Sequence, residues 1–276
     1  VVFLLIYMAR GVGILEVLVC QFIKRRDYVH RLAEKIANCY KDRLVQTFVR
    51  FNQEEIPEDP NARLIVDCTV CQIRRPKMSF EEAKVFFSGK HNIYALKKEV
   101  CVNVRTGTAA LVSRAFPGSV HDIVILRSHA EELNELLEDK TMLADLGYVG
   151  AERDVHGVVV CDENNQLLRS KRVLVECFFG RLKGLWTILS FPWTTDEKYF
   201  ERFFNIACAL TNIDILYRPL RQEDLDYNQG VLNLISDELE VQKELQRRAN
   251  QRYLRRRERR LNGLDQNSSE TLDEAI

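Results

Sequence analysis

Residues 64–69 read Leu64-Ile65-Val66-Asp67-Cys68-Thr69, an apolar run that a single carboxylate interrupts. The wider segment 63–73 is rich in leucine, isoleucine and valine, which is typical of a β-strand in a protein core. A carboxylate within such a strand is costly to bury unless it is paired or binds a metal ion. The segment therefore predicts a core strand and marks Asp67 as a candidate functional residue.

Further strands and helices are expected downstream. Strands are predicted at 94–104 and 109–116, joined by a hairpin turn at Arg105-Thr106-Gly107, and short strands at 141–146 and 157–161. Helices are predicted at 120–138 with Ser119 as N-cap, then at 170–189, 196–217 and 231–260. This order predicts an α/β fold with a mixed sheet flanked by helices.

The two ends of the chain differ from this middle part. Residues 1–50 have apolar residues at three- and four-residue spacing, which predicts helices, and residues 52–61 form an acidic loop that contains prolines. We expect a helical segment at 1–60, the α/β domain at 61–220, and a basic helix with a polar, acidic tail at 221–276. The start without Met leads us to expect that a front segment is missing or degraded.

The composition is that of a soluble globular protein. The chain has 276 residues, 46% hydrophobic and 29% charged, with a formal net charge of +0. No stretch approaches the roughly 20 clean apolar residues that cross a bilayer, so no membrane association is expected. Cys68 and Cys71 form a lone Cys-x-x-Cys whose side chains would point to opposite faces of a strand, which predicts reduced thiols and no zinc site.

Positive charge is concentrated near the C-terminus. Residues 243–260 contain nine Lys or Arg and two Glu, a local net charge of +7. The run Arg255–Arg260 is read either as a nuclear import signal or phosphate contact, or as a solvated helix end. The first interpretation places the protein in the nucleus.

Three more acids stand where chemistry is plausible. Asp122 lies in the first turn of an expected helix, where a carboxylate also favours the positive end of the helix. Asp145 ends a short strand before Gly147, where a turn-forming role is the alternative. Glu176 interrupts the apolar helical run Val173–Phe179. These three acids join Asp67 as candidate metal ligands.

Glu176 shares a helical face with two cations. Arg172 lies four residues before it and Lys183 seven after, and this spacing places all three side chains on one side of a helix. An intrahelical ion pair explains the pattern simply. The apolar neighbours favour the alternative, in which Glu176 holds a metal ion and the two cations hold phosphates beside it.

Five motifs in order resemble the PIF/Harbinger-type DDE transposases, the Harbinger transposase-derived nuclease family, over residues 63–215. They are Val66-Asp67-Cys68-Thr69, Phe87-Ser88-Gly89-Lys90-His91, Pro117-Gly118-Ser119-Val120-His121-Asp122, Ala144-Asp145-Leu146-Gly147-Tyr148 and the segment Val175–Lys183. The resemblance implies a ribonuclease H-like DDE catalytic domain at 61–220 that binds two divalent ions, Mg²⁺ or Mn²⁺.

The resemblance also implies roles for single residues. Asp67 corresponds to the acid of the first strand and Glu176 to the acid of the late helix. The second acid is either Asp122 or Asp145, so all four are expected to be catalytic metal ligands. Asp145 precedes Glu176 by 31 residues, a spacing similar to that of many such enzymes. Arg172, Glu176 and Lys183 resemble part of a signature in bacterial insertion-sequence transposases, and they predict DNA-phosphate contacts for Arg172 and Lys183. The Tyr of that signature is Arg169 here.

Family members usually carry a helix-turn-helix before the catalytic domain. Residues 5–40 look like a degenerate version, with Gly11 and Gly13 near the expected turn but an apolar segment where a polar recognition face is expected. In the family a separate Myb-like protein often helps to bind DNA, so such a partner is carried as an expectation, as is a homo-oligomer.

The expected function is metal-dependent DNA cleavage or strand transfer by a two-metal mechanism. His121 is expected to be structural rather than a general base. The main alternative is a domesticated descendant that binds DNA or protein without catalysis. A ribonuclease H-class nuclease for RNA–DNA hybrids and a purely structural α/β protein are weaker alternatives, because they leave the ordered motifs unexplained.

Overall fold

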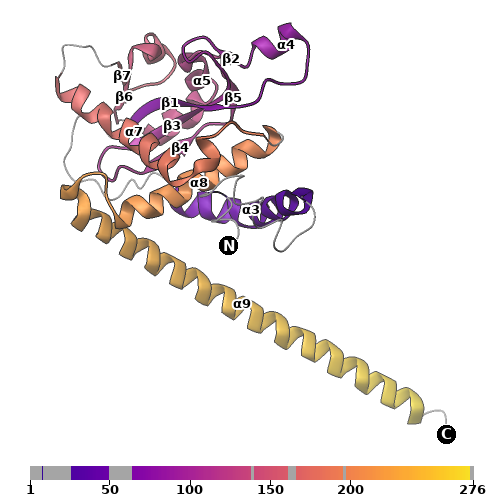
Figure 1. Ribbon diagram of the computed structural model, residues 1–276. Helices are drawn as coiled ribbons and strands as arrows, with labels where there is room; N and C mark the ends of the chain where they lie inside the picture. The colour runs from indigo at the N-terminus through magenta and orange to yellow at the C-terminus, as the bar shows by residue number, and fades with distance from the viewer. Residues whose placement is uncertain are drawn as a thin grey trace. The chain divides into compact units, whose positions relative to one another are not determined.

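The structure is a computed structural model that describes residues 8, 26–49, 64–137, 140–160, 166–194 and 197–273. The chain divides into two compact units, Val1–Asn228 and Gln229–Ile276. The first unit contains the sheet and the helices that cover it (Figure 1). The second consists of the greater part of one long helix, α9 (Leu225–Asp273). The expected turn at Gly11 and Gly13 and the loop at 52–61 lie outside the described residues.

Seven strands of the described chain form one mixed sheet. They are β1 (Leu64–Gln72), β2 (Phe87–Ser88), β3 (Ile93–Asn103), β4 (Ala109–Val112), β5 (Phe116–Pro117), β6 (Met142–Ala144) and β7 (Val158–Val160). The sheet has the order β2-β3-β1-β6-β7, and β4 and β5 also pair with β3. β3 runs antiparallel to β1 and β4, whereas β1, β6 and β7 run parallel. The α/β fold with a mixed sheet is therefore confirmed.

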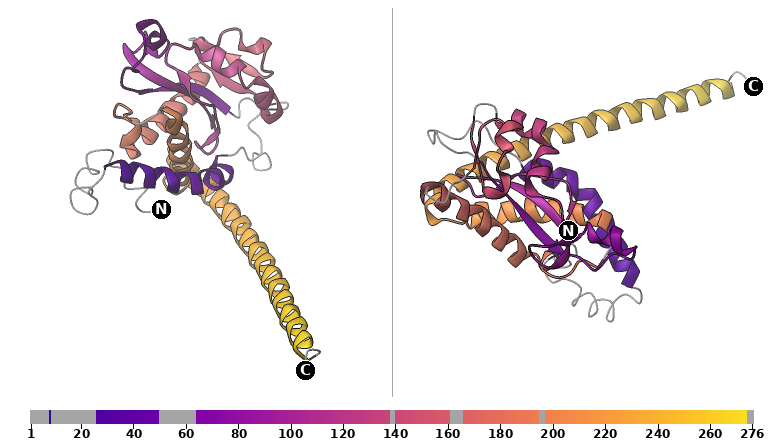
Figure 2. Two further views of the ribbon diagram at one scale, coloured as in Figure 1. Left: turned by 90° about the vertical axis from the view of Figure 1, so that its right-hand side faces the viewer. Right: turned by 90° about the horizontal axis from the view of Figure 1, so that it is seen from above.

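Two helical layers cover the sheet. One contains α3 (Arg26–Phe48), α7 (Gln166–Leu185) and α8 (Glu197–Tyr217), and their apolar side chains share a core with Ile65 and Cys71 of β1. The other contains α5 (Asp122–Arg127) and α6 (Ala130–Leu137), which pack with Leu64 and Val66. Figure 2 shows helices on both sides of the sheet. Because successive side chains of a strand point to opposite faces, β1 contributes to both cores.

The predicted helix at 120–138 with a Ser119 cap was wrong in two respects. The segment forms two helices, α5 and α6, which a break at Ser128 and His129 separates. Ser119 does not cap a helix, because α5 begins at Asp122 and His121 holds the N-cap position. The predicted strand at 109–116 is likewise divided into β4 and β5.

The other predicted elements are present with shifted ends. The helix expected at 170–189 is α7, which ends at Leu185 and is followed by the 3-10 turn η3 (Thr187–Leu189). The helix expected at 231–260 is α9, which extends beyond that range at both ends. The remaining short elements are α4 (Phe80–Lys84), η1 (Leu146–Tyr148), η2 (Ala151–Arg153) and η4 (Gln222–Asp224).

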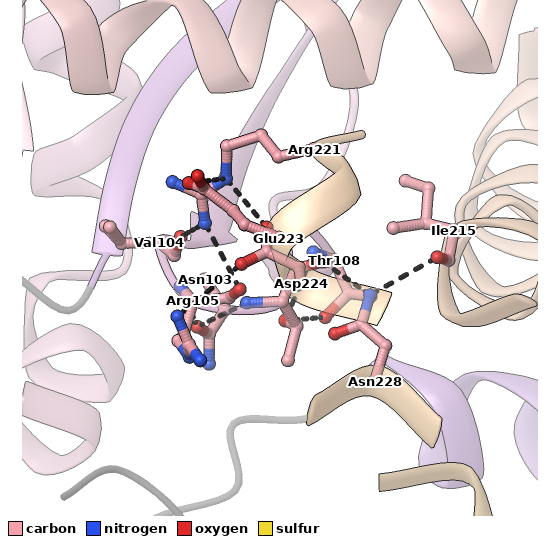
Figure 3. A network of polar contacts seen from close by, with 10 residues as sticks. Asn103, Val104, Arg105, Thr108, Ile215, Arg221, Glu223, Asp224 and Asn228 are labelled. Carbon is pink, nitrogen blue, oxygen red and sulfur yellow. Dashed lines mark hydrogen bonds and ion pairs between the residues drawn. The ribbon is translucent and has the colours of Figure 1, made fainter. Parts of the chain in front are cut away.

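The hairpin turn at Arg105-Thr106-Gly107 is confirmed, and Figure 3 shows how its surroundings hold it. Gly107 has a φ of 73°, a conformation that glycine adopts without strain. The buried carboxylate of Asp224 pairs with Arg221 at 2.7 Å and with Arg105 at 3.6 Å. Arg221 also donates to the carbonyl of Val104 at 2.8 Å. These contacts hold the turn that follows β3.

Two further expectations concern membranes and cysteines. Across the described part of the chain, no helix combines the length and the apolar character that a bilayer-spanning segment needs. Cys68 belongs to the α5 and α6 side of the sheet and Cys71 to the α7 and α8 side, so the two thiols face away from each other as predicted. Both are free thiols.

Candidate active site

Asp67 and Asp145 come from neighbouring parallel strands. Ile65 of β1 lies opposite Leu143 of β6, so two residues farther along the chains reach Asp67 and Asp145. Asp145 keeps an extended backbone, with φ −85° and ψ −179°, and directly precedes η1. Since Ile65 and Leu143 both face the layer of α7 and α8, the two aspartates are placed at the same level on that face.

The surroundings of Asp67 disfavour its charged form. Burial and the nearby carboxylates of Asp145 and Asp122 raise the pKa of Asp67 from 3.8 to about 6, against the opposing effects of its hydrogen bond from Cys68 and the charge of Arg172. The Cys68 N–H donates to Asp67 Oδ1 at 2.7 Å. The three aspartates therefore act on one another electrostatically, as expected for a cluster that a cation could neutralise.

Asp122 reaches this cluster from the opposite helical layer. It is the first residue of α5, and its Oδ1 accepts a hydrogen bond from Lys97 Nζ of β3 at 2.9 Å. The same ammonium group donates to the carbonyl of Val120 at 2.7 Å. Lys97 thus fixes the start of α5 and compensates the charge of Asp122, a contact that the sequence did not predict.

Gly147 lies where the carboxylates of Asp122 and Asp145 converge. A Cβ atom at this position would lie 3.0 Å from Asp145 Oδ1 and 3.3 Å from Asp122 Oδ2. Both oxygens therefore lie close to one point, and a side chain there would crowd them. The Gly147 N–H donates to Asp145 Oδ1 at 2.9 Å, which orients that carboxylate. Gly147 thus leaves room for both carboxylates in the turn that follows Asp145.

Glu176 lies at the margin of the aspartate cluster. Leu174, Val175 and Phe178 bury one face of α7, but the Glu176 side chain is 59% exposed and lies 3.6 Å from Arg172. The expected ion pair is therefore present. Arg172 links Glu176 to the cluster, because its charge also acts on Asp67. The structure thus brings Asp67, Asp122 and Asp145 together and connects Glu176 to Asp67 through Arg172.

Positive side chains border the cluster on the side of α7 and on the side of the turn between β2 and β3. Lys183 Nζ donates to the carbonyl of Val70 on β1 at 2.8 Å, and the charge of Arg172 acts on Asp67 of the same strand. Burial and the charges of Lys90, Lys97 and Lys183 lower the pKa of His91 in the turn between β2 and β3. The sequence did not single out Lys90, Lys97 or His91 as site residues, although the motif at 87–91 contains two of them.

Candidate metal ligands are thus present, but they do not form a closed site in this conformation. Within the residues that the structure describes, no three His, Cys, Asp or Glu side chains are arranged as a metal-ion site. A separate pocket of about 530 Å³ lies beyond the end of β1, lined by residues that include Arg74, Arg75, Phe87 and Tyr94. None of the four candidate acids lines it, so this pocket is separate from the acids.

The raised pKa of Asp67 predicts a pH-dependent cost to stability. The folded chain holds the Asp67 proton more tightly than the unfolded chain, so stability falls as pH rises from about 4 through about 6. In metal-free protein at pH 7.5, Asp67→Asn is expected to increase the free energy of unfolding by on the order of 1–3 kcal/mol. Below pH 4 the two proteins should unfold alike. Urea unfolding with a chelator present measures this, with the exposed Asp237→Asn as control. A variant less stable than wild type at pH 7.5 would contradict the assignment.

Comparison with known proteins agrees with this geometry. Neither the curated proteins nor the solved structures include a significant match. Residues 66–212, more than half of the chain, match the model of a family described as DDE superfamily endonuclease. The matched segment contains all four candidate acids together with Arg172 and Lys183. The chain therefore belongs to the DDE superfamily endonuclease family.

Proposed function

We propose that the protein is a metal-dependent DNA endonuclease and strand transferase of the PIF/Harbinger type. The observation that carries this proposal is the convergence of Asp67, Asp122 and Asp145 from β1, α5 and the end of β6. Three carboxylates that repel one another beside the central strand β1 favour a bound cation. The ordered motifs at 66–69, 87–91, 117–122, 144–148 and 175–183 support the subtype.

The fold is proposed to be ribonuclease H-like. Its support is the strand arrangement, in which β3 pairs antiparallel with both β4 and β1, and β6 and β7 continue the sheet parallel to β1. This arrangement places the end of β6 beside the first half of β1, which contains Asp67. Two acids from adjacent parallel strands are thereby held at one place in the sheet.

Asp67 and Asp145 are proposed as the principal ligands of Mg²⁺ or Mn²⁺. Carboxylate oxygens suit these ions, and both side chains lie at one level of the sheet. Asp122 already has Lys97 as counter-ion. We therefore assign the role of second catalytic acid to Asp145 and a supporting role to Asp122. Glu176 is proposed as the third, completing the set when substrate is present. Bound metal ions would activate the attacking oxygen and stabilise the leaving oxygen of a phosphodiester.

The proposed substrate is DNA, held through its phosphates. Arg172 and Lys183 lie beside the acids on α7, and Lys90 and His91 lie near them in the turn between β2 and β3. Cations at such positions orient the backbone without reading sequence. A Myb-like partner, self-association and nuclear location through Arg255–Arg260 belong to the same proposal and rest on the sequence alone.

A non-catalytic, domesticated DNA-binding descendant is the second candidate. Two observations favour it: Lys97 neutralises Asp122, and the Glu176 side chain is exposed with Arg172 as partner. A protein that had lost metal binding would keep both ion pairs permanently. The two candidates therefore differ in whether the carboxylates take up a divalent ion.

Titration calorimetry with Mn²⁺ and Mg²⁺ tests the proposal. Wild type is expected to bind either ion, and Asp67→Asn/Glu176→Gln is expected to lose this binding, while the remote Asp237→Asn control binds as wild type does. Each titration is run alone and with a DNA duplex, because a phosphate can complete the coordination. Folded wild-type protein that takes up neither ion under either condition would favour the non-catalytic candidate.

A further inference from the structure

We propose that Glu99 is a positioning residue that holds the segments carrying Asp67, Asp122 and Asp145 in register for metal binding. This inference rests on the proposed function, because it concerns the same carboxylates. Glu99 lies in the middle of β3 and is completely buried, at 0% exposure. A carboxylate in such a place is unfavourable unless neighbouring groups bind both of its oxygens. Its partners lead to each of the three aspartates.

The first connection runs through Tyr148 to Asp145. The buried Tyr148 hydroxyl donates to Glu99 Oε2 at 3.0 Å. Tyr148 is the last residue of η1, and its backbone N–H donates to the carbonyl of Asp145 at 3.1 Å. Glu99 thereby anchors the far end of the tight turn that begins at Asp145. A shift of the phenol would move this turn and its carboxylate together.

The second connection runs through His129 to α5. His129 Nε2 lies 2.8 Å from Glu99 Oε1, and the imidazole is largely buried. The His129 N–H donates to the carbonyl of Leu126 at 3.2 Å, so His129 closes the end of α5, which begins at Asp122. The contact therefore ties the short helix to β3 at its C-terminal end, while Lys97 of the same strand ties it at its start.

The third connection leads to β1. Glu99 is the cross-strand partner of Cys68, so the two side chains lie on the same face of the sheet. The Cys68 thiol lies 3.4 Å from the Tyr148 hydroxyl, and the Cys68 N–H donates to Asp67 Oδ1. The Tyr148 hydroxyl thus joins Glu99 to the strand position next to Asp67. β1, α5 and η1 consequently share one buried attachment point.

Glu99 and its contacts would affect metal affinity by setting the positions of the three aspartates. Metal ligation tolerates only small displacements of its ligands, and groups that orient the ligands commonly change affinity by about 10–100-fold when altered. Asp67, Asp122 and Asp145 belong to different elements, so local backbone structure does not fix their separations. Glu99 is the buried group that the described contacts connect to all three segments.

A double-mutant cycle between Glu99 and Tyr148 tests this inference. Glu99→Gln and Tyr148→Phe are each expected to weaken Mn²⁺ binding by about 10–100-fold, as titrated by the electron paramagnetic resonance of free Mn²⁺. The double variant should be no weaker than the more affected single variant, since both changes break the same connection. Tyr148→Phe removes one hydroxyl only, so a folded variant is available even if Glu99→Gln unfolds.

Asp224→Asn serves as the matched control. Asp224 is a buried carboxylate with two arginine partners, but these partners, Arg105 and Arg221, are different groups from Tyr148 and His129, which contact Glu99. This variant is expected to lose thermal stability and to keep wild-type Mn²⁺ affinity, which separates general destabilisation from positioning. If folded Glu99→Gln and Tyr148→Phe both kept wild-type Mn²⁺ affinity, the positioning role of Glu99 would be overturned without affecting the proposed function. Wild-type protein without any Mn²⁺ binding would instead overturn the proposed function, and this inference with it.

Discussion

Asp67→Asn is expected to lower the rate of Mg²⁺-dependent DNA cleavage by roughly 10³-fold or more, the scale found when one electrostatic group is removed from a catalytic centre. Asparagine keeps the shape of the side chain and its acceptor from the Cys68 N–H, but it removes the negative charge that would hold the ion. The variant should remain folded, because the charge that it loses is unfavourable in the metal-free protein. Cleavage of a labelled duplex, with far-ultraviolet circular dichroism as a check on folding, measures the effect.

The remaining aspartates provide the comparison within the same assay. If Asp145 is the second catalytic acid, Asp145→Asn should match Asp67→Asn, whereas Asp122→Asn should lose less because Lys97 already balances its charge. Asp237→Asn is the neutral control. Equal cleavage by wild type and folded Asp67→Asn would refute the catalytic assignment.

Gly157→Ala is expected to destabilise the fold by on the order of 3 kcal/mol. Gly157 has a φ of +74°, and an added Cβ would lie 2.3 Å from the carbonyl oxygen of Lys140. The Lys140 oxygen is part of the backbone and the added Cβ is bonded directly to the backbone of residue 157, so neither atom can rotate away. The Gly157 carbonyl accepts the N–H of Met142, the first residue of β6, so the clash displaces the strand that leads to Asp145. Urea unfolding followed by tryptophan fluorescence measures the loss.

Gly230→Ala is the matched control for this substitution. Gly230 lies within α9, is exposed, and has no neighbouring atom within reach of an added methyl group. Alanine there is expected to leave stability unchanged or raise it by roughly 0.5–1 kcal/mol, because alanine favours a helix over glycine. A Gly157→Ala protein as stable as wild type would contradict this prediction, because it would show that the Lys140 backbone moves aside at little cost.

The sequence predicted the elements whose signals are local. The apolar run around Asp67 gave β1, and the turn at Arg105–Gly107 gave the hairpin of β3 and β4, because residue preference and turn chemistry act over a few neighbours. The break between α5 and α6 was missed since apolar periodicity continues through it. The break coincides with a contact from another element, because His129 lies against Glu99 of β3.

The candidate site was predicted in part for the same reason. Asp67 is recognisable because a charge within an apolar strand is unusual, and its raised pKa agrees with that interpretation. The grouping of Asp67 with Asp122 and Asp145 came from the family resemblance, since nothing local relates residues so far apart. Lys97 and Glu99 stand in a visible charged triplet, Lys97-Lys98-Glu99, within a strand. Their partners lie on α5, η1 and the break after α5, which only the three-dimensional structure reveals.

The distant origin of the three aspartates also links ion binding to folding. The unfolded chain separates Asp67, Asp122 and Asp145 by tens of residues, so it holds no preformed site. The site exists once β1 has paired with β3 and β6 and once α5 has packed on the sheet. A divalent ion taken up there would bind the native state alone and shift the equilibrium toward it. The carboxylates whose mutual repulsion weakens the metal-free protein would then contribute to its stability.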